Sequence, residues 1–546
     1  MAGFACAVLL SSPASSAEKP GPRSAAVDLE RYARVIHVDG ARGDDVTGDG
    51  SADQPWASLP QALEEAGGAT AEGRVAVLVA QGRYVQPTFV LRSHVDLFGG
   101  YARFSEPRDV YAHATVLDGE DDHRIAFGAD DARIDGFHFV RGQVRGKGGA
   151  LLCDGTSPVI TNCIFTENRT LIPQPWAPPL LHETANDGGA VMCLNGAAPR
   201  IKHNLFYHNT TECGRGAALA ADRGSAPQIV NNVFAGNRAG FDDPMRSSDG
   251  GAISFFDHSD GVITGNVIVD NAALTRNDGG GIFVALWSAP RIVDNIIAAN
   301  FAGDDAGGLF IGGQEHRYDA PLDEHPPAGE YTVIVDGNVL VGNANSSANS
   351  GASRITMEAR VRLTNNIITE NEGGLYLQRS EVAANNNTVW QDWRFVEDKA
   401  SLGPSRFTGN ILKGPARLDD VRAGFENNML DVSSIDGKDN APVSDIFRDD
   451  GVNGDLVDLH FDPTTFTTVL TTKAALPAGA DYAGRVVRLS DSETGGQWRV
   501  IQRAAGREIV LWGRLDAVTA APRHFFILRT FTPKPEAPPG LGAGAR

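Results

Sequence analysis

The sequence has no excess of positive charge. Among its 546 residues, 48 lysines and arginines face 68 aspartates and glutamates, which gives a formal net charge of −20. Nothing in such a chain would neutralise a phosphate backbone, so the composition argues against nucleic acid as a partner. It also disfavours unassisted binding of a polyanion, unless Ca²⁺ bridges the two negative surfaces.

Long hydrophobic runs are also missing, apart from a short one at the start. Residues 1–17 hold an apolar stretch from Phe4 to Leu10 and then small residues up to Ala17. This pattern resembles a signal peptide without the usual basic n-region, and a disordered N-terminus is the alternative. No later segment approaches the roughly 20 apolar residues of a membrane span. We therefore expect a monomer that is secreted or attached to the cell surface, with no transmembrane segment.

Cysteine is scarce, and its spacing does not indicate a zinc site. The chain has five cysteines, of which Cys6 lies in the predicted signal peptide. Cys153 and Cys193 occupy matching places in two adjacent repeats, so we expect their side chains to stack on each other. The sequence leaves open whether they form a disulfide or remain two buried thiols that act as small hydrophobic groups.

Glycine is abundant, with 62 residues, and it belongs to a repeat that also contains asparagine. Each unit opens with Gly-Gly and a short apolar strand, as at Gly250 to Ile253. A turn with Pro or Ser follows, then an apolar alternation that ends in Asn, two apolar residues and a second Asn. The pairs are Asn204 and Asn209, Asn232 and Asn237, Asn266 and Asn271, Asn295 and Asn300, Asn338 and Asn343, and Asn366 and Asn371, and the pattern weakens through Asn387, Asn410 and Asn428.

This repeat predicts an all-β fold, a right-handed parallel β-helix over residues 35–450. Three short strands per coil would stack on those of the next coil about 4.8 Å away, with apolar side chains inward. An Asn at the same corner of every coil tolerates left-handed backbone geometry and can bond the amides above and below it. Such a ladder explains why Asn recurs in register, which an isolated turn residue does not.

Two stretches resemble known β-helix proteins. The Gly-Gly-Ala-Ile and Phe-x-x-Asn elements, as at Gly250 to Ile253 and Phe206 to Asn209, are similar to the repeats of polymorphic outer-membrane-like proteins. The stretch from His37 to Gly40, through Gly48 to Pro55, to a helix around Leu59 to Ala66 resembles the start of pectin-lyase-like β-helices. That resemblance implies an N-terminal capping helix. It implies little about activity, because the superfamily includes lyases, hydrolases, epimerases and adhesins.

The repeat stops before the C-terminus. Strong alternation between Asp481 and Leu528 predicts a small antiparallel β module within residues 455–530, which packs on or follows the C-terminal end of the helix. Residues 533–546 are rich in Pro and Gly and are expected to be disordered.

The segments that interrupt the coil rhythm all border one predicted sheet. They are residues 170–186, 239–248 and 272–277, before its strands, and residues 314–330, after one of them. Long loops on a rigid scaffold commonly carry function, so these would wall a groove along that sheet. Trp176 and Tyr318, on two of the loops, are candidate substrate-binding residues.

A charged residue precedes the Gly-Gly element in five consecutive units. These residues are Lys147, Asp187, Arg215, Asp249 and Asp278, and in the sixth unit Ala306 takes that place with Asp305 one residue earlier. Stacked coils would align them at the groove edge. Asp249, Asp278 and Asp305 would then be close enough to require a cation, and we expect Ca²⁺ there, or a carboxyl of raised pKa. The alternative is that each Asp only caps a turn.

Polar and aromatic residues directly follow the same predicted strands, at the C-terminal end of each strand. They include Asp222, Arg223, Asp257, His258, Trp287, Glu315, His316 and Glu358. His258, Trp287 and Glu358 match in register. An aromatic ring beside carboxylates and a histidine suits a sugar-binding cleft, so Trp287, Arg223, His316, Tyr318, Glu358 and Trp176 are the candidate substrate-binding residues.

These patterns favour a secreted protein that binds and cleaves a polysaccharide or cell-surface glycan. The candidate catalytic residues are Asp249, Asp278, Asp257, His258, Glu315 and Arg215. A glycoside hydrolase would pair Asp249 or Asp278 with a second carboxylate. A uronate lyase would use an arginine base such as Arg215, Arg223 or Arg354, with the Asp row holding Ca²⁺, but no known lyase motif is present. A non-catalytic adhesin-type binding protein is the alternative.

Overall fold

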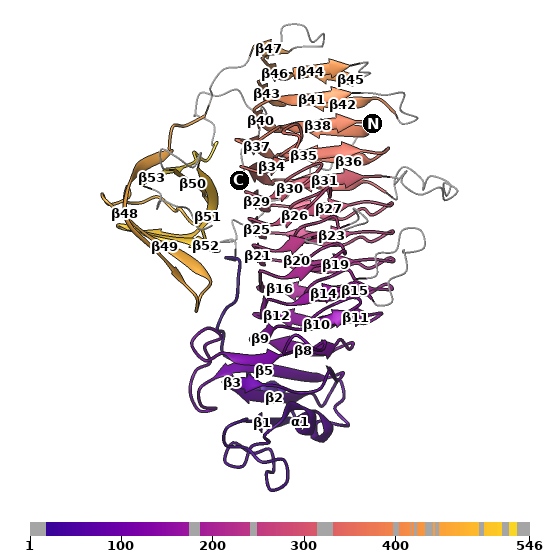
Figure 1. Cartoon of the computed structure of the whole chain (residues 1–546), viewed down its shortest axis with the longest axis vertical. Coiled ribbons are helices and arrows are strands. Elements are labelled where there is room, and N and C mark those ends of the chain that lie inside the picture. Colours follow the sequence, from indigo (N-terminus) through magenta and orange to yellow (C-terminus); the bar gives the residue numbers. More distant parts are fainter. Residues whose placement is uncertain are drawn as a thin grey trace, which may run out of the picture.

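In the computed structural model, the chain winds into a parallel β-helix with a small antiparallel barrel on its side (Figure 1). The structure describes residues 18–173, 186–240, 248–313, 331–396, 403–414, 416–419, 423–431, 440–442, 447–490, 496–515 and 523–531. The predicted signal peptide, residues 1–17, and the predicted tail, residues 533–546, lie outside them. The helices of the described part are too short to cross a membrane.

The N-terminal end of the solenoid is closed by a helix, as predicted. A short 3-10 helix, η1 (Leu29–Arg31), precedes the first strand, and α1 spans Leu59–Glu65. The Ser58 hydroxyl caps α1 by accepting a hydrogen bond from the amide of Gln61 at 3.4 Å. Leu59, Ala62 and Leu63 of α1 are buried in the main core. The helix thus covers apolar surface that the first coil would otherwise expose.

Four parallel sheets run along the solenoid, here named A to D. Sheet A contains β1 (Arg34–Val38), β2 (Val75–Ala80), β5 (Val95–Tyr101), β8 (Arg133–Asp135), β12 (Val159–Thr161), β16 (Arg200–Lys202), β20 (Gln228–Val230), β24 (Val262–Thr264), β28 (Arg291–Val293), β32 (Val333–Asp336), β36 (Arg360–Thr364), β39 (Glu381–Asn385), β42 (Ser405–Thr408) and β45 (Ala423–Glu426). Sheet B contains β3 (Gly82–Tyr84), β6 (Thr115–Asp118), β9 (Phe137–Val140), β13 (Ile164–Thr166), β17 (Leu205–Tyr207), β21 (Val233–Ala235), β25 (Val267–Val269), β29 (Ile296–Ala298), β33 (Val339–Val341), β37 (Ile367–Thr369), β40 (Thr388–Trp390), β43 (Ile411–Lys413), β46 (Met429–Leu430) and β47 (Ala441–Pro442).

Sheet C is the sheet that the interrupting segments border. It contains β4 (Phe89–Val90), β7 (Ala126–Phe127), β11 (Leu151–Asp154), β15 (Val191–Leu194), β19 (Leu219–Ala221), β23 (Ile253–Phe255), β27 (Ile282–Val284), β31 (Leu309–Gly312), β35 (Ser353–Thr356), β38 (Leu375–Gln378), β41 (Trp393–Val396) and β44 (Ala416–Asp419). Each strand pairs in parallel with the strand one coil earlier and one coil later, and each such level is called a rung below.

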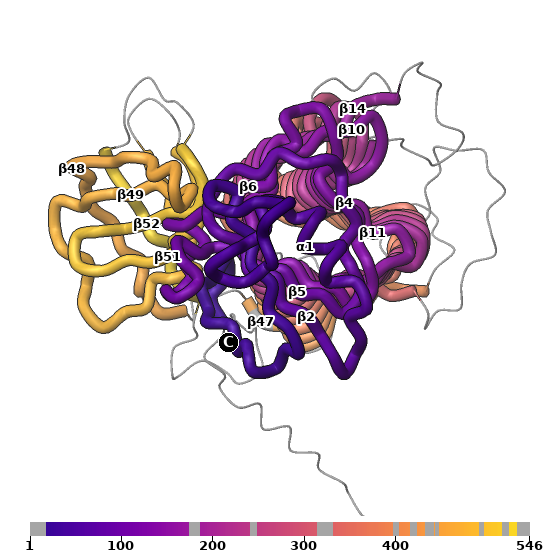
Figure 2. Tube along the Cα trace, turned by 90° about the horizontal axis from the view of Figure 1, so that it is seen from below, coloured from indigo at the N-terminus to yellow at the C-terminus, as the bar shows by residue number. Residues whose placement is uncertain are grey.

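Sheet D corrects the prediction of three strands per coil. Its strands are β10 (Gln143–Arg145), β14 (Arg169–Leu171), β18 (Thr210–Thr211), β22 (Arg238–Ala239), β26 (Ala272–Ala273), β30 (Phe301–Ala302) and β34 (Ala344–Asn345). Figure 2, which looks along the solenoid from its N-terminal end, shows β10 and β14 at a corner apart from β4 and β11. Strands of two or three residues are too short to show alternation, and the sequence therefore gave no sign of this sheet.

Two ladders of asparagine connect the rungs, as predicted. At one corner Asn209 donates from Nδ2 to Phe165 O at 2.9 Å and to Asn237 Oδ1 at 2.9 Å, and its amide donates to the same Oδ1 at 3.0 Å. The first ladder contains Asn168, Asn209, Asn237, Asn271, Asn300, Asn343 and Asn371, and the second contains Asn204, Asn232, Asn266, Asn295, Asn338, Asn366, Asn387, Asn410, Asn428 and Asn440.

The sequence suggested that the ladder asparagine itself adopts the left-handed conformation. In the structure the residue before it does. His208 has φ 53°, Gly236 has φ 68° and Asp270 has φ 58°, each directly before a ladder Asn. The preceding residue turns the chain, and the Asn amide is thereby directed along the solenoid axis. Steric strain at that position is smallest for Gly, Asn and Asp, which explains their frequency there.

The two glycines of each Gly-Gly element are required for different reasons. Gly188 has φ 68°, which a side chain tolerates poorly, whereas a Cβ on Gly189 would clash with the carbonyls of Ala217 and Thr210. The first glycine therefore makes the turn into sheet C, and the second lets neighbouring rungs approach closely. The free thiols of Cys153 and Cys193 are buried on adjacent rungs of the strands that follow, and burial raises the pKa of Cys153 to about 12.

A stack of aromatic rings fills the core inside sheet B. The centroids of Phe139, Phe165, Phe206 and Phe234 lie 4.6 to 4.7 Å apart, with the rings nearly parallel. All four side chains are fully buried. Each such burial contributes about 2 to 3 kcal/mol, and each ring pair adds about 1 kcal/mol.

The C-terminal module is antiparallel, as predicted, and closes into a barrel. Its strands in barrel order are β48 (Val452–Asp462), β49 (Thr467–Thr472), β52 (Glu508–Trp512), β51 (Gln497–Ala505), β50 (Val486–Ser490) and β53 (His524–Ile527). It lies along the side of the solenoid rather than on its end (Figure 1). Val500 and Trp512 of the barrel share an apolar cluster with Val233 and Val267 on the outward face of sheet B.

The docking position follows from the sequence of sheet B. Strands such as β17, β21 and β25 are apolar at three successive positions, and all of these positions are buried. A strand that is apolar on both faces needs a cover on each, and the barrel supplies the outer one. The segment after Ala17 is held in the same interface, because Gly21 donates from its amide to Asn231 O at 3.0 Å and lies against the Trp512 ring.

We expect Asn237→Ala to lower the free energy of unfolding by about 3 kcal/mol. The change leaves the amide and Nδ2 of Asn209, and the carbonyl of Phe206, without their buried partners, and each such loss costs about 1 to 3 kcal/mol. Urea unfolding followed by circular dichroism measures the change. Asn453→Ala, at an exposed position of β48, is the control and should change stability by less than about 0.5 kcal/mol. Equal effects of the two substitutions would contradict the ladder's role.

We expect Arg499→Ala to loosen the barrel from the solenoid. The Arg499 side chain is 3% exposed, and its Nη2 lies 3.2 Å from Asp270 Oδ2 on the solenoid. Asp270 is partly exposed and also contacts Arg238, so the expected cost is about 2 kcal/mol rather than that of a fully buried pair. Limited proteolysis should cut between solenoid and barrel several-fold faster. Arg523→Ala, at an exposed residue of the barrel, should leave the rate unchanged.

Candidate functional site

The charged residues before the strands of sheet C form one row. The strand register aligns Lys147, Asp187, Arg215, Asp249, Asp278 and Asp305 on successive rungs. Asp305, and not Ala306, therefore occupies the sixth place. The amide of Gly279 donates to Asp305 O at 3.0 Å, which confirms this alignment.

The aspartates of the row cap the backbone of the next rung. Asp249 Oδ1 accepts from the amide of Asp278 at 2.9 Å, and Asp278 Oδ1 accepts from the amide of Asp305 at 3.0 Å. Asp249 and Asp278 are 2% and 3% exposed. Across the described residues, no three His, Cys, Asp or Glu side chains are grouped as metal ligands. One oxygen of Asp249 and one of Asp278 thus cap a turn, the alternative that the sequence left open, and calcium at the three aspartates stays a prediction.

The Lys147 side chain connects this row, which precedes the strands of sheet C, with a residue that follows one of those strands. Its Nζ lies 2.6 Å from Asp187 Oδ2 and 3.4 Å from Asp222 Oδ2. Asp187 precedes β15, whereas Asp222 directly follows β19, so the lysine side chain reaches both edges of the outward face of sheet C. Asp222 stands among the polar residues that the sequence places beside these strands, but it was not one of the predicted catalytic or binding residues. It lies one residue before a listed candidate, and only the fold brings it to Lys147.

Arg215 lies on the outward face of sheet C, one rung beyond Asp187. Its Cζ is 3.6 Å from the centroid of the Phe256 ring, and the residue is 2% exposed. The outward positions at the centre of β19 and β23 are the small residues Ala220 and Ser254, whereas the larger Phe283 follows on β27. The small residues leave room for the guanidinium, and the aromatic face stabilises its charge.

The two carboxyls beside Lys147 have pKa values that move in opposite directions. Burial opposes ionisation of Asp187, but Lys147 and Arg215 hold the pKa of that carboxyl below its usual value. Burial raises the pKa of Asp222, and the nearby Asp187 and Asp257 raise it further against the attraction of Lys147. The pKa of Asp222 is thus raised and that of Asp187 lowered, an ordering suited to acid–base chemistry.

Asp257 and His258 connect this group to solvent. Their side chains are 39% and 54% exposed, and Asp257 Oδ1 lies 2.9 Å from His258 Nδ1. Both residues have positive φ, 51° and 55°, so the chain turns sharply as it leaves β23. We refer to Lys147, Asp187, Arg215, Asp222, Asp257 and His258 as the charged cluster. It contains three of the residues that the sequence proposed as catalytic.

The remaining candidates are not members of this cluster, and four of them lie outside the described residues. The Trp287 ring is 5% exposed and packs edge-on against Tyr331 at 4.6 Å, so its face is covered. The Glu358 carboxylate lies 3.9 Å from the Arg379 guanidinium. Arg223 follows Asp222 with φ 54°, and its amide donates to Asp222 Oδ1 at 2.8 Å. Trp176, Glu315, His316 and Tyr318 lie outside the described residues.

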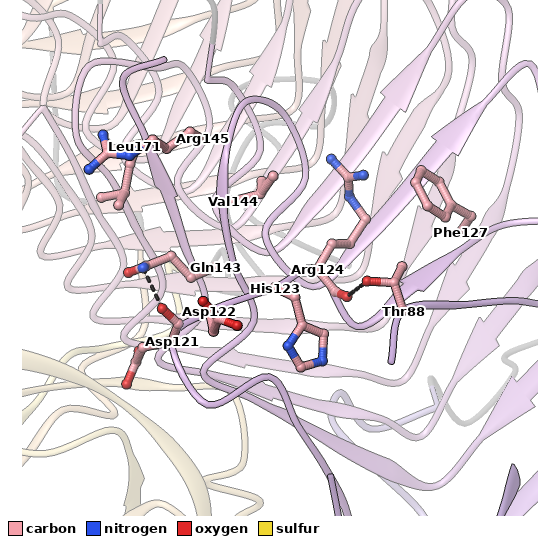
Figure 3. A pocket seen from close by; sticks show the side chains of 10 residues that line it. All are labelled: Thr88, Asp121, Asp122, His123, Arg124, Phe127, Gln143, Val144, Arg145 and Leu171. Atoms are coloured by element: carbon pink, nitrogen blue, oxygen red, sulfur yellow. Dashed lines mark hydrogen bonds between the residues drawn. The ribbon is translucent and has the colours of Figure 1, made fainter. Parts of the chain in front are cut away.

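A cavity of about 590 Å³ lies near the main chain at Lys147, and none of its lining residues belongs to the charged cluster. It is lined by Thr88, Asp121, Asp122, His123, Arg124, Phe127, Gln143, Val144, Arg145 and Leu171, from the first rungs of sheets C and D. In Figure 3 the polar side chains of Asp121, Asp122 and Gln143 gather on one side and Phe127 lies on the other.

Arg124 joins the cavity to the charged cluster. It donates from Nη2 to Lys147 O at 2.6 Å and from Nε to Gly148 O at 2.9 Å, while its guanidinium lies 4.6 Å from the Phe127 ring. A wall of the cavity therefore fixes the main chain from which the Lys147 side chain extends. This contact could not be predicted from the sequence, because Arg124 belongs to no repeat element.

Comparison with known proteins identifies the solenoid. A family model described as a right handed beta helix region matches residues 125–317. No curated protein matches the chain. Among solved structures, the crystal structure of pectate lyase Pel9A is similar at 12% identity, over 76% of this chain and 82% of that chain, with a TM-score of 0.33. The matched residues include the whole charged cluster, which is therefore built on a right-handed parallel β-helix.

Proposed function

We propose that this protein is an extracellular, carbohydrate-active β-helix that binds a glycan beside sheet C and cleaves it at the charged cluster. The observation that carries the proposal is the position of the Lys147 ammonium between Asp187 and Asp222. The carbonyl of the same lysine accepts a hydrogen bond from Arg124, which lines a cavity of about 590 Å³. The apolar stretch from Phe4 to Leu10 supports an extracellular location.

The cavity has the size and the lining of a small-ligand site. Pockets for small ligands commonly measure about 300 to 1,000 Å³ and combine apolar walls with a few polar groups. Phe127 and Leu171 offer apolar surface, and His123, Asp122 and Gln143 offer hydrogen-bonding groups. A sugar unit presents both an apolar ring face and hydroxyl groups, and it would fit this mixture.

The two carboxyls suit hydrolysis of a glycosidic bond. Asp222, whose pKa is raised, would donate its proton to the leaving-group oxygen as the bond to the anomeric carbon breaks. The ionised Asp187 would stabilise or attack that carbon, and water would then complete the hydrolysis. Since both contact one ammonium, their nearer oxygens lie within about 6 Å of each other, the shorter spacing typical of retaining enzymes.

A binding protein without catalysis is the second candidate, because most of the charged cluster is buried and such ion pairs also occur as purely structural groups. The purified protein should be tested against a panel of polysaccharides, with and without EDTA. New reducing ends without ultraviolet absorbance support hydrolysis, and unsaturated products indicate a lyase. Binding without any product would establish the second candidate.

We expect Asp222→Asn to lower kcat at least about 100-fold while the affinity for the glycan is retained, since the amide cannot donate the proton that the leaving group needs. Reducing-end assays give kcat, and isothermal titration calorimetry gives the affinity. Asp154→Asn is the matched control, because Asp154 lies exposed at the same edge of sheet C. Unchanged turnover in Asp222→Asn would remove this residue from the mechanism.

The pH dependence of kcat/KM provides a separate prediction. Activity requires Asp187 ionised and Asp222 protonated. The rate should therefore rise as the pH passes the lowered pKa of Asp187, and it should fall as the pH passes the raised pKa of Asp222. The optimum should be acidic, and Asp187→Asn should abolish most of the activity across the whole range. A rate that rises through neutral pH would contradict these roles.

A further inference from the structure

An arginine, a tyrosine and a second arginine are stacked on the outward face of sheet C, far from the charged cluster. Arg354 on β35, Tyr376 on β38 and Arg394 on β41 are paired on successive rungs. The Cζ atoms of Arg354 and Arg394 lie 4.2 and 4.6 Å from the centroid of the Tyr376 ring. The ring is thus placed between two guanidinium groups, and the contacts hold both of them in a fixed orientation.

The two guanidinium groups differ in their partners. Arg354 Nη1 lies 3.1 Å from Asp305 Oδ1, and Arg354 Nη2 donates to Gln378 Oε1 at 2.6 Å. The Arg394 guanidinium makes no hydrogen bond or ion pair with any residue in the described part of the chain, and Arg394 is only partly buried. The charge of Arg354 is therefore matched by a carboxylate, and the charge of Arg394 is not.

This imbalance favours an anion. Two like charges on one ring repel each other, and only one of them is compensated by Asp305. Stacking leaves the terminal nitrogens of an arginine as a planar fork, which matches the two oxygens of a carboxylate or a sulfate. Arg417 on β44 is the register partner of Arg394, so the backbone places another arginine on the following rung.

We propose that Arg394, positioned by Tyr376 and Arg354, binds an oxyanion carried by a sugar of the glycan. The inference rests on the proposed function and adds the substrate class, an anionic oligosaccharide. β41 lies six strands beyond β19 in sheet C, so the site is roughly 29 Å from Asp222 at about 4.8 Å per rung. A ligand that reaches both places must be an extended chain of several sugars. With a net charge of −20, the protein needs such a local cation to retain an anionic ligand.

The test is binding of matched charged and uncharged probes by isothermal titration calorimetry at low ionic strength. One pair is a galacturonate hexasaccharide and its methyl ester, and the other is a dextran sulfate oligosaccharide and the unmodified dextran oligosaccharide. All titrations use the full chain with Asp222→Asn, which prevents cleavage. The further substitution Arg394→Gln is compared with Arg406→Gln, which removes the same charge from an exposed position on sheet A.

We expect at least one charged probe to bind about tenfold more tightly than its uncharged counterpart. The pair that shows this preference distinguishes a carboxylate ligand from a sulfate ligand. Arg394→Gln should abolish the preference and Arg406→Gln should keep it. High salt and excess inorganic sulfate should weaken it in the protein that retains Arg394, which provides a test even if Arg394→Gln does not fold.

Equal binding of charged and uncharged probes, or an undiminished preference in a folded Arg394→Gln protein, would overturn the proposal. A preference that survives high salt and excess sulfate would overturn it as well. Failure of the proposed function would be separate, because it would appear as unchanged glycan cleavage in Asp222→Asn alone, whatever the charge of the bound probe.

Discussion

The alignment of each strand with the strand one coil away is the constraint on which the rest of the structure depends. The two asparagine ladders fix it at two corners of the middle coils and at one corner from Asn387 to Asn440, since an amide such as that of Asn209 bonds both the previous coil and the next. A slip by one residue would leave these buried amides without partners and would turn apolar side chains outward. Every row of side chains along the solenoid inherits its order from this alignment.

The charged cluster is a product of that order. Residues 75 positions apart, Lys147 and Asp222, meet because the coils between them return the chain to the same face. Their charges are tolerated in a buried place because each cation has an anion or an aromatic ring beside it. The same arrangement separates the pKa values of Asp187 and Asp222, which isolated aspartates would not show.

Sheets B and C of the same solenoid differ in the side chains on their outer sides. Sheet B is apolar on both sides, and its outer side is covered by the barrel, whose Trp512 also contacts the N-terminal segment at Gly21. Sheet C carries charged and aromatic residues on its outer side, from Lys147 to Arg394. The solenoid therefore has one face that is covered by another part of the chain and another on which charged and aromatic side chains are concentrated.

The resemblance to pectin-lyase-like β-helices implies the capping helix around Leu59 to Ala66, which spans Leu59–Glu65 in the structure. The sequence alone determined the solenoid and the row that begins at Lys147, because these follow from the repeat. It also placed Arg215, Asp257 and His258 beside the same sheet. It did not reveal sheet D, whose strands are too short to show a period, or the barrel's position along sheet B. It left open whether Asp249 and Asp278 cap turns or hold a cation, and it did not indicate that Asp222 meets Lys147 or that the Trp287 ring is buried. Those outcomes depend on which side chains meet across coils, and only the tertiary structure decides them, because the contacts join residues that no local pattern relates.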